Sequence, residues 1–445
     1  MSDAGAAVAP LIEQARQCVA RQDFARADAL YGQLLAQGAV AARIESLRYL
    51  AMRAFRAGDP ERAVDFSRRV TELEPGVSAH WLNLGVACQA AADLPAARAA
   101  FAEALRRDAR NHTAALCIGE MLEACGDRTG AAMAYWRAII DAQARGAWRN
   151  NDTTPPALRP RVVHAMDFVD VERPRLLQQV LAPLRESYGA DEMRRIRAAL
   201  RIYLRQEAPD YPDPRQKPSF LYVPGLPTAA FLPLDVFPWI GELEARTAAI
   251  RDEMLGAVAS REGLQPFHDR EQLSQLVAGA SEEGGWDALF FYRHGERFDA
   301  NCARCPVTTA SLERLPRVAI RDHGPEILFS LLRPGAHILP HRGVTNARVV
   351  AHLPLVVPPD CALHVLGEEP RAWREGKVMV FDDTFEHEAW NRSGELRVIL
   401  LMDTWNPWLS EAERLACTRL VEGIGDFRIG GERIAERSRS DEALL

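Results

Sequence analysis

Lysine is almost absent from this chain of 445 residues. Of the 54 basic residues only Lys217 and Lys377 are lysines, which we interpret as a bias of the coding sequence and not as a functional signal. The net charge is −7, and no basic stretch is present that would follow a phosphate backbone. A nucleic acid is therefore not an expected partner.

Long apolar runs are also absent. No run reaches the roughly 18 apolar residues that a membrane span needs. The first residues, MSDAGAAVAPLIEQARQ, lack the basic start and apolar stretch of a secretory signal. The eight cysteines are scattered, as in proteins of a reducing compartment. We therefore expect a cytoplasmic protein without a membrane partner.

The chain is longer than the roughly 250–300 residues at which single hydrophobic cores stop growing, so several domains are expected. Composition and patterning divide it into four segments. These are a helical repeat domain at 1–144, a linker with connector helices and a segment rich in proline and aromatic residues at 145–240, a β-strand domain at 241–410, and a C-terminal helix with a mobile tail at 411–445.

The first segment repeats with a period of 34 residues. Gly85 and Phe101 recur as Gly119 and Tyr135, in a context rich in alanine and leucine. This pattern resembles the tetratricopeptide repeat, in which each unit is a pair of antiparallel helices. Three or four such units form a stable stack whose concave face would bind a peptide or protein. Alternatively, the stack serves only dimerisation or domain packing.

The segment from Pro209 to Pro238 carries eight prolines, which exclude a helix or an inner strand. Five aromatic residues are interleaved with them and Trp239 follows directly, and a flexible tether has little reason to carry so many. We expect this segment to lie across the β-strand domain as one wall of a substrate channel. An amphipathic helix at 241–262, strands from 286 to about 405 and a helix at 409–423 should follow.

Two histidines lie at the ends of predicted strands. His341 precedes a glycine-containing turn, and His387 follows the polar run Asp382-Asp383-Thr384. Two imidazoles on strand ends are what an open-sided metal site in a small β-barrel needs. Neutral imidazole suits iron, zinc and copper alike, so the spacing does not choose the metal.

Arg397 lies in the apolar strand predicted at 395–404, on the same face as Asp403. Burying a guanidinium is costly unless a carboxylate or phosphate meets it. In an oxygenase that uses 2-oxoglutarate, the distal carboxylate of this co-substrate would meet the arginine.

The phrases RPGAHILPHRGVTNAR, HLPLVVP, EGKVMVFDDTFEHEAWN and LRVILLMDTWNP resemble the aspartyl/asparaginyl β-hydroxylase family. Its members are Fe(II)- and 2-oxoglutarate-dependent oxygenases on a double-stranded β-helix, or jelly roll. The resemblance implies that His341 and His387 are the catalytic iron ligands and that Arg397, helped by Ser330, binds 2-oxoglutarate. It also implies that His352 lies beside the iron and faces the co-substrate.

Two positions qualify the resemblance. Most related oxygenases have a carboxylate ligand two residues after the first histidine. The aspartyl/asparaginyl β-hydroxylase family is similar to this chain in lacking that ligand, and the residue at this position here is Gly343. A water or an acid such as Asp382 or Asp383 is expected there, although these acids could form only a turn. Arg348 is implied to bind substrate, but Val350 replaces an arginine that helps animal members hold the acidic substrate, which leaves the substrate open.

The implied reaction is O2-dependent hydroxylation of the β-carbon of aspartyl or asparaginyl residues, and the repeats favour a peptide or protein substrate. One alternative is a hydroxylase of a small-molecule or lipid-linked acid. Another is a non-catalytic binding scaffold. The other histidines of the last third, among them His337 and His364, are more typical of structural residues.

Overall fold

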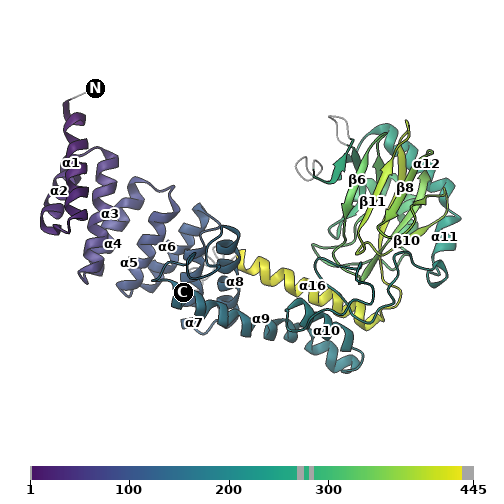
Figure 1. Cartoon of the computed structure of the whole chain (residues 1–445), viewed down its shortest axis with the longest axis horizontal. Coiled ribbons are helices and arrows are strands. Elements are labelled where there is room, and N and C mark those ends of the chain that lie inside the picture. Colours follow the sequence, from purple (N-terminus) through teal and green to yellow (C-terminus); the bar gives the residue numbers. More distant parts are fainter. Residues whose placement is uncertain (1–2, 268–274, 280–284, 433–445) are drawn as a thin grey trace. The chain divides into compact units, whose positions relative to one another are not determined.

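A computed structural model of the chain describes residues 3–267, 275–279 and 285–432 (Figure 1). They form two compact units, one comprising residues up to Leu176 together with those from Asp426 onward, the other Leu177–Gly425. The mobile tail expected at 436–445 lies outside the described residues. None of the described helices is long and apolar enough to cross a membrane.

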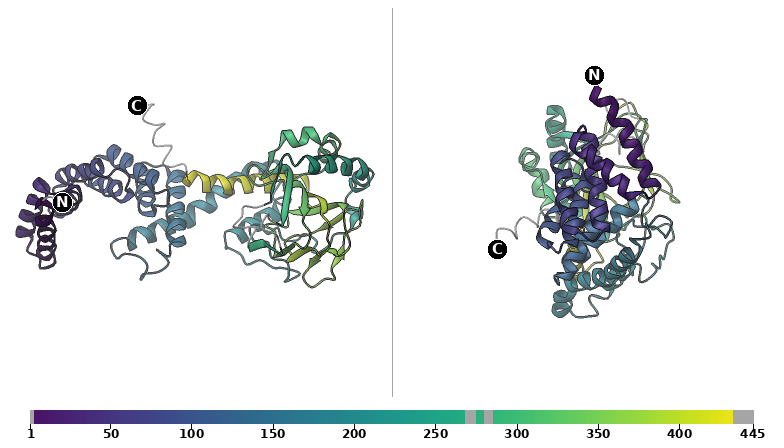
Figure 2. Two further views of the ribbon diagram at one scale, coloured as in Figure 1. Left: turned by 90° about the horizontal axis from the view of Figure 1, so that it is seen from above. Right: turned by 90° about the vertical axis from the view of Figure 1, so that its left-hand side faces the viewer.

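The predicted helical character of the first part of the chain is confirmed. Successive helices pack in pairs and follow one another in a curved row (Figure 2). The helices are α1 (Asp3–Ala20), α2 (Phe24–Gln37), α3 (Val40–Arg56), α4 (Pro60–Leu73), α5 (Ser78–Ala90), α6 (Leu94–Arg107), α7 (His112–Ala124), α8 (Arg128–Ala144) and α9 (Arg159–Tyr188), the last of which has residues in both units.

The second helix of each pair begins in the same way. Asp23, Asp59, Asp93 and Asp127 are the N-cap residues of α2, α4, α6 and α8, and each side chain accepts a hydrogen bond from the backbone N–H three residues later. A cap of this kind stabilises a helix by about 1 kcal/mol. The spacing of the aspartates thus fixes where each pair turns.

Two glycines allow close contact within the pairs. A Cβ atom on Gly85 would lie 2.4 Å from the ring of Phe101, and one on Gly119 would lie 2.4 Å from Tyr135. Both rings are fully buried. Each aromatic ring therefore packs against the glycine of its own helix pair.

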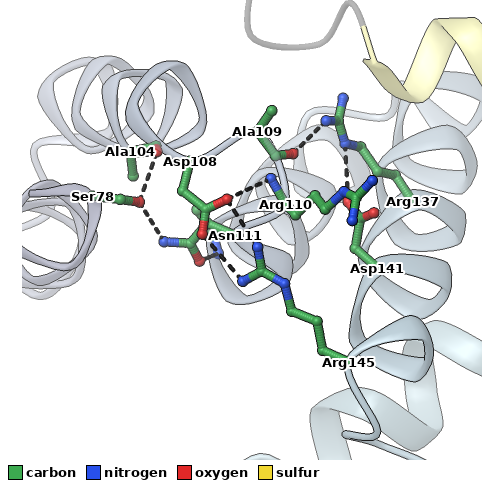
Figure 3. Close-up of polar contacts among 10 residues, drawn as sticks. Ser78, Ala104, Asp108, Ala109, Arg110, Asn111, Arg137, Asp141 and Arg145 are labelled. Carbon is green, nitrogen blue, oxygen red and sulfur yellow. Dashed lines mark hydrogen bonds and ion pairs between the residues drawn. The ribbon is translucent and has the colours of Figure 1, made fainter. Parts of the chain in front are cut away.

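Polar contacts join one pair to the next (Figure 3). The amide of Asn111 donates to the hydroxyl of Ser78 at 2.8 Å, and this hydroxyl donates to the carbonyl of Ala104 at 2.7 Å. Arg145 makes two hydrogen bonds to the carboxylate of Asp108, at 3.1 and 3.2 Å. The connections between helix pairs are thus held by side chains of consecutive repeats.

The second unit contains the end of α9, α10 (Arg194–Tyr203) and two antiparallel sheets. The larger sheet has the order β1-β3-β5-β12-β7-β10 with β4 beside β3, and the smaller has the order β2-β6-β11-β8-β9. The strands are β1 (Leu264–Pro266), β2 (Val277–Ala278), β3 (Trp286–Arg293), β4 (Glu296–Arg297), β5 (Ile327–Leu332), β6 (His337–His341), β7 (Arg348–Val356), β8 (Cys361–Val365), β9 (Arg371–Ala372), β10 (Met379–Phe381), β11 (His387–Asn391) and β12 (Arg397–Trp405).

Each face of the larger sheet is buried. In β12, Val398, Leu400 and Met402 pack in a core that includes residues of the covering helices. The opposite face meets the smaller sheet through a second core that contains Leu332 and Val350. The alternation predicted for β12 therefore separates a helix-covered face from a face directed between the sheets.

The covering helices are α11 (Ile240–Glu244), α12 (Thr247–Ser260), α14 (Asp299–Arg304) and α15 (Pro306–Leu312), and α16 (Glu411–Glu432) follows the last strand (Figure 1). The single helix expected at 241–262 is wrong, because the helix is interrupted after Glu244. There the hydroxyl of Thr247 donates to the Glu244 carbonyl at 2.7 Å. The Glu244 carboxylate accepts a hydrogen bond from Val378 N–H at 2.9 Å, which anchors the break.

Residues 209–239, here called the strap, contain only the short 3-10 helix η1 (Leu234–Val236). The strap follows the β-strand domain through backbone hydrogen bonds. Lys217 N–H donates to Thr384 O at 3.0 Å, and Leu232 N–H donates to Val380 O at 3.0 Å. The proline-rich segment is thus fixed to the strands, as the aromatic content predicted.

Gly85→Ala should lower the free energy of unfolding of the helical unit by about 1–3 kcal/mol, because the new methyl group must displace the buried Phe101 ring. Gly32→Ala is the matched control, since Gly32 lies in α2 with open space around it and alanine should stabilise that helix by up to about 1 kcal/mol. Urea unfolding followed by circular dichroism measures both variants. Equal destabilisation by the two substitutions would contradict the packing described.

Candidate metal and co-substrate site

The structure brings His341 and His387 together. They are register partners on the antiparallel strands β6 and β11, and their ring centroids are 4.2 Å apart. Nδ1 of His341 lies 2.8 Å from Leu339 O, and Nδ1 of His387 lies 2.9 Å from Phe385 O. Because a carbonyl can only accept, both Nδ1 atoms carry hydrogen and both Nε2 lone pairs remain available. Such a pair could hold one metal ion.

No cluster of three or more histidine, cysteine or acidic side chains with metal-binding geometry occurs among the described residues. Beside the histidine pair, the space next to Gly343 is filled by an acid: a Cβ atom on Gly343 would lie 2.2 Å from the Asp383 carboxylate. Oδ1 of Asp383 is buried and has no hydrogen-bond partner in the described part of the chain. Asp383 thus stands where the sequence lacks a carboxylate ligand.

Arg397 is a buried cation, 1% exposed, at the start of β12. Its Nη1 lies 3.5 Å from both the carbonyl and the hydroxyl oxygen of Ser330, and its guanidinium lies over the ring of Trp373, 4.9 Å from the centroid. Within the described residues, Nε has no partner and no carboxylate pairs with this side chain. Burial lowers the pKa of Arg397 to about 10. The group lacks an anion.

His352 supplies a second unsatisfied donor. Its Nδ1 accepts a hydrogen bond from Trp373 Nε1 at 3.2 Å, so that Nε2 carries the hydrogen. This Nε2 is buried and has no partner within the described ranges. Burial, with the nearby charge of Arg397, holds the pKa of His352 well below its ordinary value. His352 is therefore a neutral hydrogen-bond donor.

These groups share the space between the sheets. Ser330, His352 and Arg397 come from β5, β7 and β12 of the larger sheet, and the two metal-ligand candidates come from the smaller one. The ring of Phe381 lies 5.1 Å from the rings of both His352 and His387 and so links the two sets. Unsatisfied donors beside two available imidazole nitrogens fit a metal ion together with an organic dicarboxylate.

Arg348 is placed differently from Arg397. Its guanidinium pairs with Asp383 at 2.9 Å and with Asp403 at 2.5 Å. Burial alone would lower the pKa of Arg348, but these carboxylates together with Glu326 raise it. The charge of Arg348 is thus compensated within the protein, and its substrate contact stays a prediction.

Sequence patterns alone missed three residues of this site. Asp403 pairs with Arg348, Trp373 contacts both Arg397 and His352, and Trp286 donates to the Ser330 hydroxyl at 3.0 Å. Only Asp403 carried a signal, since it is a lone acid on the Arg397 face of an apolar strand. Neither tryptophan carried a signal in the sequence, because each meets its partner in the site only after the chain has folded.

The structural interpretation of the remaining histidines on the smaller sheet agrees with their contacts. His337 and His364 each make a hydrogen bond to the carboxylate of Glu388, at 2.7 and 2.8 Å. Glu388 follows His387 on β11, so its side chain points to the opposite face of the strand. These two histidines therefore belong to the outer face and not to the site.

Residues 244–407 match the family model described as aspartyl/asparaginyl beta-hydroxylase. The match covers the β-strand part of the chain, which is thus similar to the aspartyl/asparaginyl β-hydroxylase family. Human aspartyl/asparaginyl beta-hydroxylase is 34% identical over 175 residues, which are 39% of this chain and 22% of the human protein.

Two further relatives cover more of their own length. Human aspartate beta-hydroxylase domain-containing protein 1 is 37% identical over 207 residues, 45% of this chain and 50% of that protein. Ornithine lipid ester-linked acyl 2-hydroxylase of Rhizobium tropici is 34% identical over 178 residues, 40% of this chain and 60% of that protein. The matches therefore span between about a fifth and three fifths of these relatives.

The stability of the metal-free protein should depend on His387 in acid. Burial and the neighbouring His341 lower the pKa of His387 from 6.5 to about 3. Between these values the unfolded chain binds a proton at this residue and the folded chain does not. The free energy of unfolding should therefore fall as the pH is lowered below 6.5, by up to about 1.4 kcal/mol per pH unit.

Urea unfolding in the presence of a chelator, at several pH values, checks this dependence. His387→Gln should flatten the profile over this pH window. Arg21→Gln, at an exposed arginine of the helical unit, should leave it unchanged. A profile that His387→Gln does not alter would speak against a buried neutral imidazole at this position.

Proposed function

We propose that the chain is an Fe(II)- and 2-oxoglutarate-dependent dioxygenase that uses O2 to hydroxylate the β-carbon of aspartyl or asparaginyl residues in a peptide or protein. The observation that carries this proposal is Arg397, a buried guanidinium with no anion among the described residues, on the sheet that faces a pair of available imidazoles. The match of residues 244–407 to a hydroxylase family model supports the same reaction class.

His341 and His387 would hold the iron through their Nε2 atoms, because backbone carbonyls already occupy both Nδ1 hydrogens. When bound, iron and 2-oxoglutarate supply the oxidation by which one oxygen atom of O2 enters a C–H bond and the other enters succinate. The protein contributes ligand orientation, since each ring is fixed by its carbonyl. Asp383 lies beside the pair, next to Gly343, where its carboxylate would supply a further oxygen near the metal.

Arg397 would bind the distal carboxylate of 2-oxoglutarate, with Ser330 as a further donor. The indole N–H of Trp286 engages the Ser330 hydroxyl oxygen, which orients the hydroxyl hydrogen away from that indole. His352 would donate from Nε2 to a carboxylate oxygen of the same molecule. The aromatic and aliphatic side chains between the sheets exclude water, which strengthens each of these contacts.

The architecture that we propose for this function is a tetratricopeptide-repeat stack followed by a double-stranded β-helix. The 34-residue period, the recurring aspartate caps and the glycine and ring pairs support the first assignment. Two facing antiparallel sheets support the second. We place the reaction in the cytoplasm, because the eight cysteines are free thiols.

We propose that the helical unit recruits the polypeptide substrate. A cavity of about 720 Å³ opens between helices α1, α3, α4 and α5. Its lining includes Met52 and Phe55, the latter 46% exposed, and the exposed Arg48, for which no ion pair occurs among the described residues. Nε2 of His80 bonds Glu74, so its buried, unpartnered Nδ1 can accept from a peptide N–H. These features fit an apolar peptide with an acidic side chain.

A second candidate function is hydroxylation of a lipid-linked or small-molecule acid. Val350 is buried in the core between the sheets, and Arg348 is compensated by two carboxylates. Among the described residues around the histidine pair, Arg397 is then the cation that has no carboxylate partner. The co-substrate would pair with it, which leaves no such cation for an acidic substrate. A reacting group without charge fits this arrangement, and one relative is named as a lipid acyl hydroxylase.

The purified chain should convert 2-oxoglutarate to succinate only with Fe(II). His341→Ala and His387→Ala should each lower this turnover at least about 100-fold, since removal of a ligand removes the metal. Arg397→Lys should raise the KM for 2-oxoglutarate by about tenfold or more, because lysine keeps the charge but loses the two-pronged contact. Succinate is measured by chromatography.

Arg371→Lys, at an exposed arginine over Phe231, is the matched control and should retain turnover. Full turnover by His341→Ala would remove the metal assignment. Absence of turnover by the wild-type chain with Fe(II) would favour the non-catalytic scaffold. Added oxygen in peptides or in lipid extracts, detected by mass spectrometry, separates the two candidate substrates.

Arg48→Glu should reduce hydroxylation of proteins in a cell extract by about tenfold, a loss of ~1.4 kcal/mol of binding free energy, and leave turnover without added protein unchanged. Mass spectrometry counts the proteins that gain one oxygen atom. Arg43→Glu, on the same helix but outside the cavity lining, is the control. Equal hydroxylation by both variants would show that the helical unit does not recruit the substrate.

A further inference from the structure

The strap contacts the two turns next to the histidine pair, one after His341 and one before His387. Ser219 N–H donates to Gly343 O at 3.2 Å, and Phe220 N–H donates to Val344 O at 2.9 Å, directly after His341. Lys217 N–H donates to Thr384 O at 3.0 Å, shortly before His387. One continuous piece of backbone therefore spans the turns 343–346 and 382–385.

A side chain of the strap reaches further into the second turn. Gln216 is 1% exposed, and its Nε2 donates to Oδ2 of Asp382 at 2.6 Å. The other oxygen of Asp382 accepts from the backbone N–H of Thr384 at 2.9 Å and from its hydroxyl at 2.5 Å. Asp382 thus organises the 382–385 turn through Oδ1, and its Oδ2 is satisfied by Gln216 of the strap.

The turn leads directly to the histidine. Phe385 N–H donates to Asp382 O at 3.3 Å, and Phe385 O accepts the Nδ1 hydrogen of His387 at 2.9 Å. Gln216 also forms an isolated antiparallel bridge with Phe385. A short series of hydrogen bonds therefore connects the Gln216 amide, through Asp382 and Phe385, to the imidazole ring.

The same turn carries Asp383. Its backbone carbonyl accepts from Gly343 N–H at 2.6 Å, and its carboxylate fills the space beside Gly343. Displacement of the 382–385 turn would therefore move an acid and a histidine at once. The strap precedes residues 244–407, which the family model matches, so these contacts come from outside the matched domain.

We propose that Gln216 is a positioning residue, which holds the Asp382 turn and thereby sets the ring orientation of His387 and the place of Asp383. This inference rests on the proposed metal site. Glutamine suits the role because its amide donates to a carboxylate without adding charge to a buried position. Methionine has a similar length but cannot donate, so it leaves Oδ2 of Asp382 unpaired.

The test compares Gln216→Met with Lys217→Ala in the full chain. The Lys217 side chain is exposed and its contact to Thr384 is made by the backbone, so this variant keeps the strap in place. Co(II) affinity is measured by calorimetry and the Co(II) ligand field by visible absorption. Gln216→Met should weaken Co(II) binding by about 10- to 100-fold and change the spectrum, as loss of a supporting partner does at other metal sites.

A double variant supplies the rescue. Gln216→Glu combined with Asp382→Asn reverses donor and acceptor, and the new side-chain amide can still accept from Thr384. The combination should recover most of the Co(II) affinity that each single substitution loses. Additive losses would overturn the direct bond as the cause. Wild-type affinity in a folded Gln216→Met protein would overturn the positioning role.

A readout without metal separates this inference from the proposed function. In metal-free protein, hydrogen exchange at Thr384 and Phe385 should be faster in Gln216→Met than in Lys217→Ala, and exchange in β5 should be equal. If the wild-type chain binds no Co(II), the metal site fails whatever the exchange shows. If exchange at the turn is unchanged, the role of Gln216 fails even where Co(II) binds.

Discussion

The buried guanidinium of Arg397 is the constraint on which the site depends. An ion of this kind costs several kcal/mol to bury, and a contact with an aromatic ring offsets about 2 kcal/mol of that. Ser330 at 3.5 Å and Trp373 at 4.9 Å are therefore partial compensation. Among the described residues, the two sheets enclose this charge together with the unsatisfied donor of His352, and the anion that we propose for this space would satisfy both.

The second arginine shows what compensation looks like in the same domain. Arg348 has two carboxylates within ion-pair distance, whereas Arg397 has none in the described part of the chain. The two arginines therefore differ: the charge of Arg348 is compensated within the protein, and the proposed function assigns Arg397 to a ligand. Because Val350 adds no charge to the core between the sheets, selectivity in the proposed function would come from shape, from hydrogen bonds or from the helical unit.

The parts of this structure that follow from local patterns could be predicted. Alternation placed Arg397 on one face of β12, and turn residues placed His341 and His387 at strand ends, because strand period and turn chemistry act within a few positions. That these three residues lie in one site was implied by the family resemblance. Trp373 and Gln216 could not be predicted, since their partners lie between 21 and 166 residues away. The break after Glu244 depends likewise on distant Val378.

The missing carboxylate ligand explains why the turns around the histidine pair need outside support. A carboxylate two residues after His341 would lie in the turn that directly follows β6 and would be carried by it. Asp383 instead reaches the same space from another turn, and a backbone hydrogen bond of 2.6 Å between Gly343 and Asp383 is what joins the two. A side chain at Gly343 would collide with this acid. The geometry of the pair therefore depends on two turns being held at a fixed separation, and the strap is the segment that bonds to both.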